Sequence, residues 1–148
     1  MKNFKCFFCY TIWCLLVCSC TFTTSKLNDK SDQLLGEKIT SDFYKAMKER
    51  NYKNSAGYFS EEFSKKTDTG KLFKFYRDYE KKTGLINRSA VVSCETKSTK
   101  EGSNIYKSFV VIYRVERSIK PTQERFILKS MGNAEPKIYR YEIDDKLK

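Results

Sequence analysis

The chain of 148 residues has the length of one domain with a short leader before it. Its formal net charge is +11, and its 29 lysines and arginines are scattered among 18 acidic residues, so a solvated basic surface or an anionic membrane is favoured over nucleic acid. The absence of histidine excludes histidine-dependent triads, histidine-based metal sites and histidine pH switches.

The segment 1–19 has the pattern of a signal peptide. It begins with two lysines, Lys2 and Lys5, and a 13-residue apolar run follows at positions 6–18. The length of that run fits the apolar region of a signal peptide and is short for a membrane span, which needs ~20 residues. Val17 and Ser19 stand three and one positions before Cys20, which predicts cleavage between Ser19 and Cys20.

This leader resembles that of a bacterial lipoprotein, in which the cysteine at the first mature position receives a lipid. The resemblance implies lipid attachment at Cys20, export to the cell envelope and contact with a lipid bilayer. Cys18 departs from the pattern, because Ala, Ser or Thr is more usual two positions before the cleaved bond. Two alternatives stay open: a secretory peptide cut at the same bond without a lipid, and an anchor that is not cleaved.

Two segments follow the leader: a short polar linker and then a globular domain. Residues 20–31 are rich in Thr, Ser, Asn, Asp and Lys, and they are expected to form a flexible tether. A single α+β domain is expected over residues 32–145. The chain therefore divides into a signal peptide at 1–19, a tether and one domain.

The cysteines cluster at the start of the chain: all but one of the six lie at or before Cys20, which leaves Cys94 alone in the domain. Small secreted scaffolds use several cysteine pairs, so a disulfide framework is not expected. Cys6 and Cys9 have the spacing of half a zinc or redox motif, but no second pair follows, and no metal or cofactor is predicted. Cys94 is interpreted as a small buried hydrophobe, with a reactive thiol as the alternative.

Apolar residues at helical spacing predict three helices. The first spans residues 31–50 and is capped by Ser31 or Asp32. Its apolar face recurs every four residues: Leu35, Ile39, Phe43 and Met47. A second, shorter stretch contains Gly57, which weakens a helix by ~1 kcal/mol relative to alanine and favours a break. Its apolar residues are three or four apart: Tyr52, Ala56, Phe59 and Phe63.

The third helix is expected to begin near Thr69 and to end at Gly84, a left-handed cap. Alternating patterns then predict four strands. These cover residues 88–96, 105–116, 124–129 and 137–143, with turns between them at 100–104, 118–122 and 131–136. The inward positions assigned to the strands are apolar or aromatic, with Cys94 as the one exception. On the last strand Tyr139, Tyr141 and Ile143 alternate.

Helices followed by hairpin-linked strands predict an α+β fold, with N-terminal helices packed on a curved four-stranded antiparallel sheet. The segments 43–47, 51–52, 72–85 and 138–143 carry a resemblance to the nuclear transport factor two-like (cystatin-like) superfamily, and in particular to small bacterial lipoproteins of unknown function. The resemblance implies a sheet wrapped into a cone with a cavity. Candidate cavity-lining residues are Phe43, Tyr76, Phe109 and Tyr113.

Two functions from different classes follow. The first is a membrane-tethered, non-enzymatic domain that binds a protein or a small apolar ligand at the cell envelope. The second is an isomerase-like or dehydratase-like enzyme that uses Tyr and Glu groups, such as Tyr113 with a cavity-facing carboxylate. No catalytic residue of the superfamily can be assigned to a position of this chain. A purely structural role at the envelope is a third hypothesis.

Overall fold

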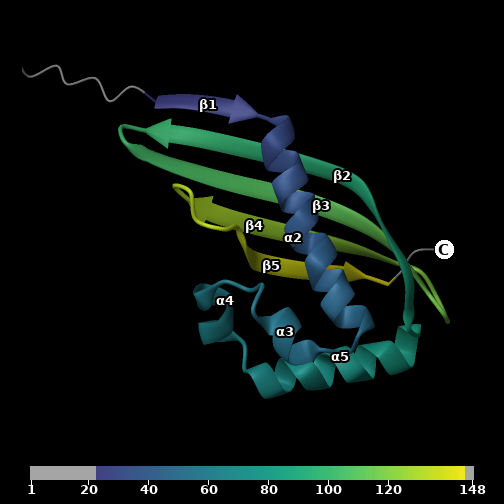
Figure 1. Ribbon diagram of the computed structural model, residues 1–148. Coiled ribbons are helices and arrows are strands. Elements are labelled where there is room, and N and C mark those ends of the chain that lie inside the picture. Colours follow the sequence, from purple (N-terminus) through teal and green to yellow (C-terminus); the bar gives the residue numbers. More distant parts are fainter. Residues whose placement is uncertain (1–22, 146–148) are drawn as a thin grey trace, which may run out of the picture.

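The structure is a computed structural model that describes residues 23–145 (Figure 1). In this range α2 crosses one face of a five-stranded sheet (Figure 1). Three further helices lie beside the C-terminal half of α2 and the β5 edge of the sheet (Figure 1). The elements in chain order are β1 (Thr23–Leu27), α2 (Lys30–Lys48), α3 (Tyr52–Ala56), α4 (Glu61–Lys66), α5 (Thr69–Thr83), β2 (Ile86–Glu101), β3 (Asn104–Arg117), β4 (Thr122–Met131) and β5 (Lys137–Asp144).

The strands are ordered β1-β2-β3-β4-β5, and every neighbouring pair is antiparallel. The expected α+β architecture, with helices packed against an antiparallel sheet, is therefore confirmed. The expected number of strands is wrong, because β1 adds a fifth strand by pairing with β2. The pairing runs from Thr23 opposite Glu101 to Leu27 opposite Lys97.

Strand β1 lies within the segment that was expected to be a flexible tether. All five of its side chains are exposed, so no apolar alternation marks it in the sequence. Its pairing with β2 rests on the backbone and continues into the next residue. The Asn28 amide donates to the Thr96 carbonyl at 2.8 Å, and the Thr96 amide donates to Asn28 Oδ1 at 3.0 Å.

Helix α2 begins one residue earlier than expected, and its cap is Asp29 rather than Ser31 or Asp32. Asp29 Oδ1 accepts hydrogen bonds from the Ser31 and Asp32 amides at 2.9 and 3.4 Å, which satisfies two amides that the helix itself leaves unpaired. On its buried face Gly36 lies against the sheet, where an added Cβ would meet Phe109 Cδ1 at 3.0 Å. A side chain at this position would press on the Phe109 ring, so glycine lets the helix lie close to the sheet.

The second helical stretch is broken, as Gly57 indicated. Helix α3 ends at Ala56 with Gly57 as its C-cap, and α4 starts at Glu61 with Ser60 as its N-cap. Between them Phe59 forms an isolated parallel bridge with Ile138 of β5. This bridge ties the short helices to the edge of the sheet.

Helix α5 begins at Thr69 and ends at Thr83, as expected. Gly84 follows with φ = 89°, in the region that favours glycine. A Cβ at this position would lie 2.2 Å from Ser118 Oγ and 2.6 Å from the Ile119 amide nitrogen. The chain therefore needs glycine here to pass from α5 into β2 beside the β3–β4 loop.

The core lies between α2 and the inner face of the sheet, and it is largely aromatic. The Phe43 ring meets the rings of Phe126 and Tyr141 edge-on, with centroids 5.4 and 5.5 Å away. Of the inward residues expected on β3 and β4, Ile105 at the start of β3 is only half-buried. The others are buried: Phe109, Val111, Tyr113, Val115, Phe126 and Leu128.

The alternation expected on β5 is wrong at Tyr139. The register between β4 and β5 shifts between Ile127 and Leu128, so Ile138 and Tyr141 both face the core. Tyr139 lies on the outer face, under the ammonium group of Lys129 at 3.7 Å from the ring centroid. Two buried inward residues of β4, Thr122 and Glu124, are not apolar, and the candidate site forms around Glu124.

Candidate functional site

Glu124 of β4 is fully buried and points toward the core. It stands two and four positions before Phe126 and Leu128, so it shares their face of the strand. The interpretation of the inward positions as apolar except for Cys94 is therefore wrong at Glu124. The available signal was the period of two, which places Glu124 on the same face as those two residues.

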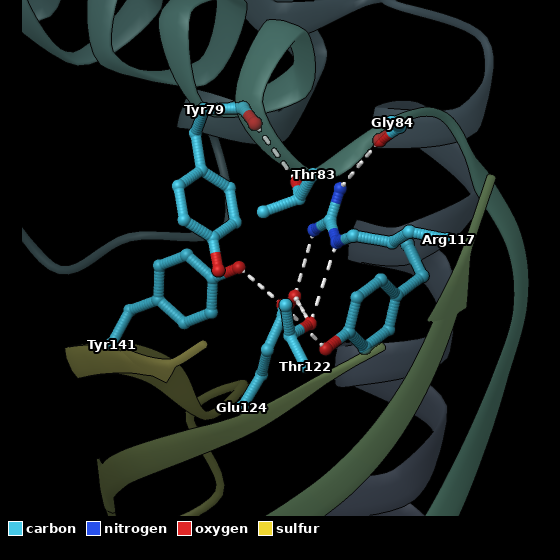
Figure 2. Close-up of polar contacts among 8 residues, drawn as sticks. Tyr79, Thr83, Gly84, Arg117, Thr122, Glu124 and Tyr141 are labelled. Carbon is cyan, nitrogen blue, oxygen red and sulfur yellow. Dashed lines mark hydrogen bonds and ion pairs between the residues drawn. The ribbon is translucent and has the colours of Figure 1, made fainter. Parts of the chain in front are cut away.

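The Glu124 carboxylate is satisfied on both oxygens (Figure 2). Oε1 accepts from Arg117 Nη2 at 2.7 Å and from Thr122 Oγ1 at 2.9 Å. Oε2 accepts from the Tyr44 hydroxyl at 2.8 Å and from the Tyr141 hydroxyl. A carboxylate has about four lone-pair positions, and here four donors occupy them. We call these five residues the carboxylate cluster.

Arg117 supplies the positive charge of the carboxylate cluster, and its side chain is only 4% exposed. Its Nη1 donates to the Gly84 carbonyl and its Nε donates to Thr122 Oγ1, both at 3.4 Å. The guanidinium also lies 5.2 Å from the centroid of the Tyr79 ring (Figure 2). The turn after α5, the end of β3 and the start of β4 are thus joined by one side chain.

The two tyrosines that bond Glu124 stay protonated. Burial first, and then the negative charge of Glu124, hold the pKa values of Tyr44 and Tyr141 well above their usual range. Both hydroxyls therefore act as donors to the carboxylate. Both oxygens of Glu124 already accept hydrogen bonds, and both tyrosines are neutral. The carboxylate cluster therefore has the properties of a structural network rather than of a general base.

A pocket of about 170 Å³ opens beside the carboxylate cluster, between α5 and the ends of three strands. Tyr141 and Arg117 belong both to the cluster and to the pocket wall. The remaining lining residues are Met47, Lys48, Tyr52, Tyr76, Tyr79, Glu80, Leu85, Ile86, Asn87 and Ile143. We call this space the tyrosine pocket, because four of its lining residues are tyrosines.

Within residues 23–145, two tyrosine hydroxyls in this pocket are buried without a hydrogen-bond partner: those of Tyr76 and Tyr79. Tyr76 is only 3% exposed. Burial raises the pKa values of both tyrosines, and the Glu124 charge adds to the rise. Ser55 and Thr122 lie close enough to lower these pKa values slightly, but neither forms a hydrogen bond of normal geometry with the tyrosine. Both hydroxyls are neutral donors without an acceptor.

The tyrosine pocket lacks a free base among its lining residues. Glu80 is its one acidic lining residue, and Arg50 Nη2 pairs with Glu80 Oε1 at 2.6 Å. The donors that line the pocket are tyrosine hydroxyls, the Arg117 guanidinium, the Lys48 ammonium and the Asn87 carboxamide. Such a wall is complementary to a small molecule that presents an oxygen acceptor.

The four cavity-lining candidates do not lie together at this pocket. Tyr76 lines it, whereas Phe43 and Phe109 are completely buried in the core. Tyr113 is also in the core, and its hydroxyl lies 2.9 Å from Thr40 Oγ1 in a hydrogen bond. Ser19 and Cys20, the predicted cleavage and lipid-attachment residues, lie outside the described residues 23–145.

Cys94 of β2 is half-buried and packs against the core. Its thiol donates to the Gln33 carbonyl at 3.6 Å. Burial, with a smaller effect of the Glu37 charge, raises the pKa of this thiol to about 11. A thiol with that pKa is almost entirely protonated near neutral pH, so its environment is that of a packing residue rather than of a nucleophile.

Comparisons of the chain with protein-family models, with curated proteins and with solved structures find no match. Within residues 23–145, none of the helices combines the length and the apolar character needed to cross a bilayer. The same part of the chain has no group of three or more Cys, Asp or Glu side chains arranged to hold a metal ion.

Proposed function

We propose that the protein is a lipid-anchored, non-enzymatic domain of the cell envelope that binds a small molecule in the tyrosine pocket. The observation that carries this proposal is the pair of buried, unpartnered hydroxyls of Tyr76 and Tyr79. A buried polar group without a partner destabilises a protein by about 1–3 kcal/mol. A ligand oxygen that accepts from either hydroxyl would remove that penalty.

The size and chemistry of the pocket define the class of ligand. A cavity of about 150 Å³ accommodates benzene, so a pocket of about 170 Å³ suits a molecule with one ring or a short branched chain. Tyrosine and arginine donors favour a carbonyl or carboxylate oxygen on that molecule. The apolar side chains of Met47, Leu85 and Ile143 would contact its remaining atoms.

Binding is favoured over catalysis because the pocket lacks a group that could take a proton. Glu124 already accepts four hydrogen bonds, and Glu80 is paired with Arg50. Tyr113, the residue considered for an isomerase-like or dehydratase-like reaction, does not line the pocket. General base catalysis needs a basic group within hydrogen-bond reach of the substrate proton.

The ligand proposal can be tested with benzamide, whose carbonyl oxygen is an acceptor on a single ring. We expect the purified protein to bind benzamide in a saturation-transfer NMR titration. Tyr76→Phe combined with Tyr79→Phe should weaken binding at least about fivefold, since each lost hydrogen bond contributes about 1 kcal/mol. Tyr139→Phe, on the outer face of the sheet, is the matched control and should bind normally. Equal binding by all three proteins would contradict the proposal.

The anchor is supported by the leader and by the cysteine at its predicted cleavage site. Cells that express the protein should incorporate labelled fatty acid into it, and the Cys20→Ala variant should incorporate none. Equal labelling of the two proteins would refute lipid attachment at Cys20.

We propose further that the fold is of the nuclear transport factor two-like type, which is supported by the order of helices followed by four hairpin-linked strands.

A further inference from the structure

We infer that the outer face of the sheet, at the end where β2 turns into β3, docks onto an anionic phospholipid surface. The inference rests on the proposed lipid attachment at Cys20 and names the surface that the anchored domain turns toward the bilayer. The occupant is the lipid headgroup layer, and the groups that contact it come from β1, β2, β3 and β4.

The first argument is the short length of chain between the anchor and the sheet. Strand β1 begins at Thr23, which pairs with Glu101 beside the Gly102–Ser103 turn. Cys20 stands three positions before Thr23, and three extended residues span at most about 11 Å. A flexible tether over the whole of positions 20–31 would leave the domain free to turn, whereas this spacing keeps the β2–β3 hairpin end close to the lipid.

The second argument is the set of side chains on the outer face at this end. Directly paired residues of an antiparallel sheet share a face. One row across the strands contains Leu27, Lys97, Ser108 and Lys129. The next row toward the turn contains Ser25, Thr99, Tyr106 and Met131. Both rows lie opposite the buried row of Phe109 and Leu128, so they face away from the helices.

The lysines of these rows carry charge that is not neutralised. Lys97 and Lys129 are exposed, and neither forms an ion pair with another residue in the described part of the chain. Farther along the same face Arg125 and Arg140 both pair with Glu142, whereas Arg88 and Arg114 form no ion pair within the described residues. At the hairpin end the two lysines are accompanied by one exposed carboxylate, that of Glu101. The lysines at the hairpin end are therefore distinguished by their closeness to the proposed anchor.

These lysines line a shallow groove of about 490 Å³, together with Tyr106, Met131 and Tyr139, and Glu62 is the one acidic residue in its lining. The apolar side chains beside them are exposed to an unusual degree: Leu27 by 70%, Met131 by 62% and Tyr106 by 42%. Lysines next to exposed apolar and aromatic side chains are typical of surfaces that rest in the headgroup region of a bilayer.

The test uses the intact lipidated protein in vesicles of phosphatidylcholine alone, or with about one third phosphatidylglycerol. Lysine acetylation rates are measured by mass spectrometry after flotation. We expect Lys97 and Lys129 to react roughly tenfold more slowly on the anionic vesicles, since two lysines near such a surface favour the docked state by about 30 to 1. High salt should abolish this protection.

Controls lie within the same molecule and in one variant. Lys71 and Lys74 are exposed on α5, on the helix side of the sheet, and should react equally on both vesicles. Lys100, beside the hairpin turn, should be protected in the native protein but not in Lys97→Gln combined with Lys129→Gln.

Two outcomes overturn the inference in distinguishable ways. A protein that does not float with phosphatidylcholine vesicles lacks the lipid, which removes the proposed anchor and the docking inference with it. A protein that floats with both kinds of vesicle, but whose Lys97 and Lys129 react at the same rate on each, keeps the anchor and refutes the docking surface.

Discussion

The carboxylate cluster and the tyrosine pocket share two side chains but differ in how their polar groups are satisfied. In the carboxylate cluster, four donors surround the two oxygens of Glu124. In the tyrosine pocket, the hydroxyls of Tyr76 and Tyr79 have no acceptor in the part of the chain that the structure describes. Hydrogen bonds that are complete stabilise a fold, whereas buried donors that lack a partner mark a place where another molecule can supply one.

The largest effect should follow from breaking the carboxylate cluster. Arg117→Met removes the charge partner of a fully buried carboxylate and should lower the free energy of unfolding by about 3–5 kcal/mol. Urea denaturation measures this change. Adding Glu124→Leu removes the stranded charge and should restore part of the loss.

The control for this prediction is an exposed ion pair. Lys38→Met breaks the pair with Asp42, whose two side chains are 67% and 39% exposed, and should leave the unfolding midpoint unchanged. Equal destabilisation by Arg117→Met and Lys38→Met would show that the carboxylate cluster is not a buried structural network.

A smaller effect should follow from Gly84→Ala, at the junction of the two regions. Gly84 ends the helix that carries Tyr76 and Tyr79, and its carbonyl accepts from Arg117. An alanine would be strained at φ = 89° and would clash with Ser118, so we expect a loss of about 2–3 kcal/mol in urea denaturation.

Gly102→Ala is the matched comparison for this change. Gly102 also has a positive φ, of 60°, but a Cβ there would meet nothing within 4 Å. Its loss should be about 1 kcal/mol, from backbone strain alone. If the two variants lose the same stability, contact with the β3–β4 loop is not what requires glycine at position 84.

The smallest expected effect is a loss of stability at alkaline pH, which is absent near neutral pH. Burial raises the pKa values of Tyr44, Tyr76, Tyr79 and Tyr141 above the usual tyrosine value of 10.0. Their contribution is therefore fully present below about pH 10 and is lost as the pH rises further, because the unfolded chain releases protons that the folded chain keeps.

Urea denaturation between about pH 8 and 11 measures this loss. The background should be Cys94→Ala, because the Cys94 thiol has a pKa raised to about 11 and titrates in the same range. Tyr76→Phe with Tyr79→Phe should reduce the slope above about pH 10. An unchanged slope would show that these two hydroxyls ionise equally in both states.

The sequence predicts those parts of the molecule that depend on local patterns. The period of two on β3 correctly places Phe109 and Val111 in the core, and Gly84 correctly ends the third helix. Strand β1 could not be predicted, because its side chains are all exposed and its pairing with β2 depends on backbone groups far along the chain.

The candidate site was less accessible to prediction. The position of Glu124 on the inward face follows from its spacing to Phe126, but its partners do not follow from local spacing. Tyr44 is 80 positions away in the chain, and Tyr141 comes from the neighbouring strand, where it pairs with Phe126. The tyrosine pocket likewise combines residues of six elements and the turn after α5. Such convergence depends on tertiary packing, which a periodic pattern does not specify.

The most direct test of the difference between the two regions is one pair of variants. Urea denaturation should show that Tyr141→Phe lowers the free energy of unfolding by about 1.5–3 kcal/mol, since it removes a hydrogen bond to a buried charged group. Tyr76→Phe removes an unpartnered hydroxyl and should leave the free energy unchanged or raise it. An equal loss in both variants would contradict the account, because the Tyr76 hydroxyl would then be a structural donor rather than a group that awaits a ligand.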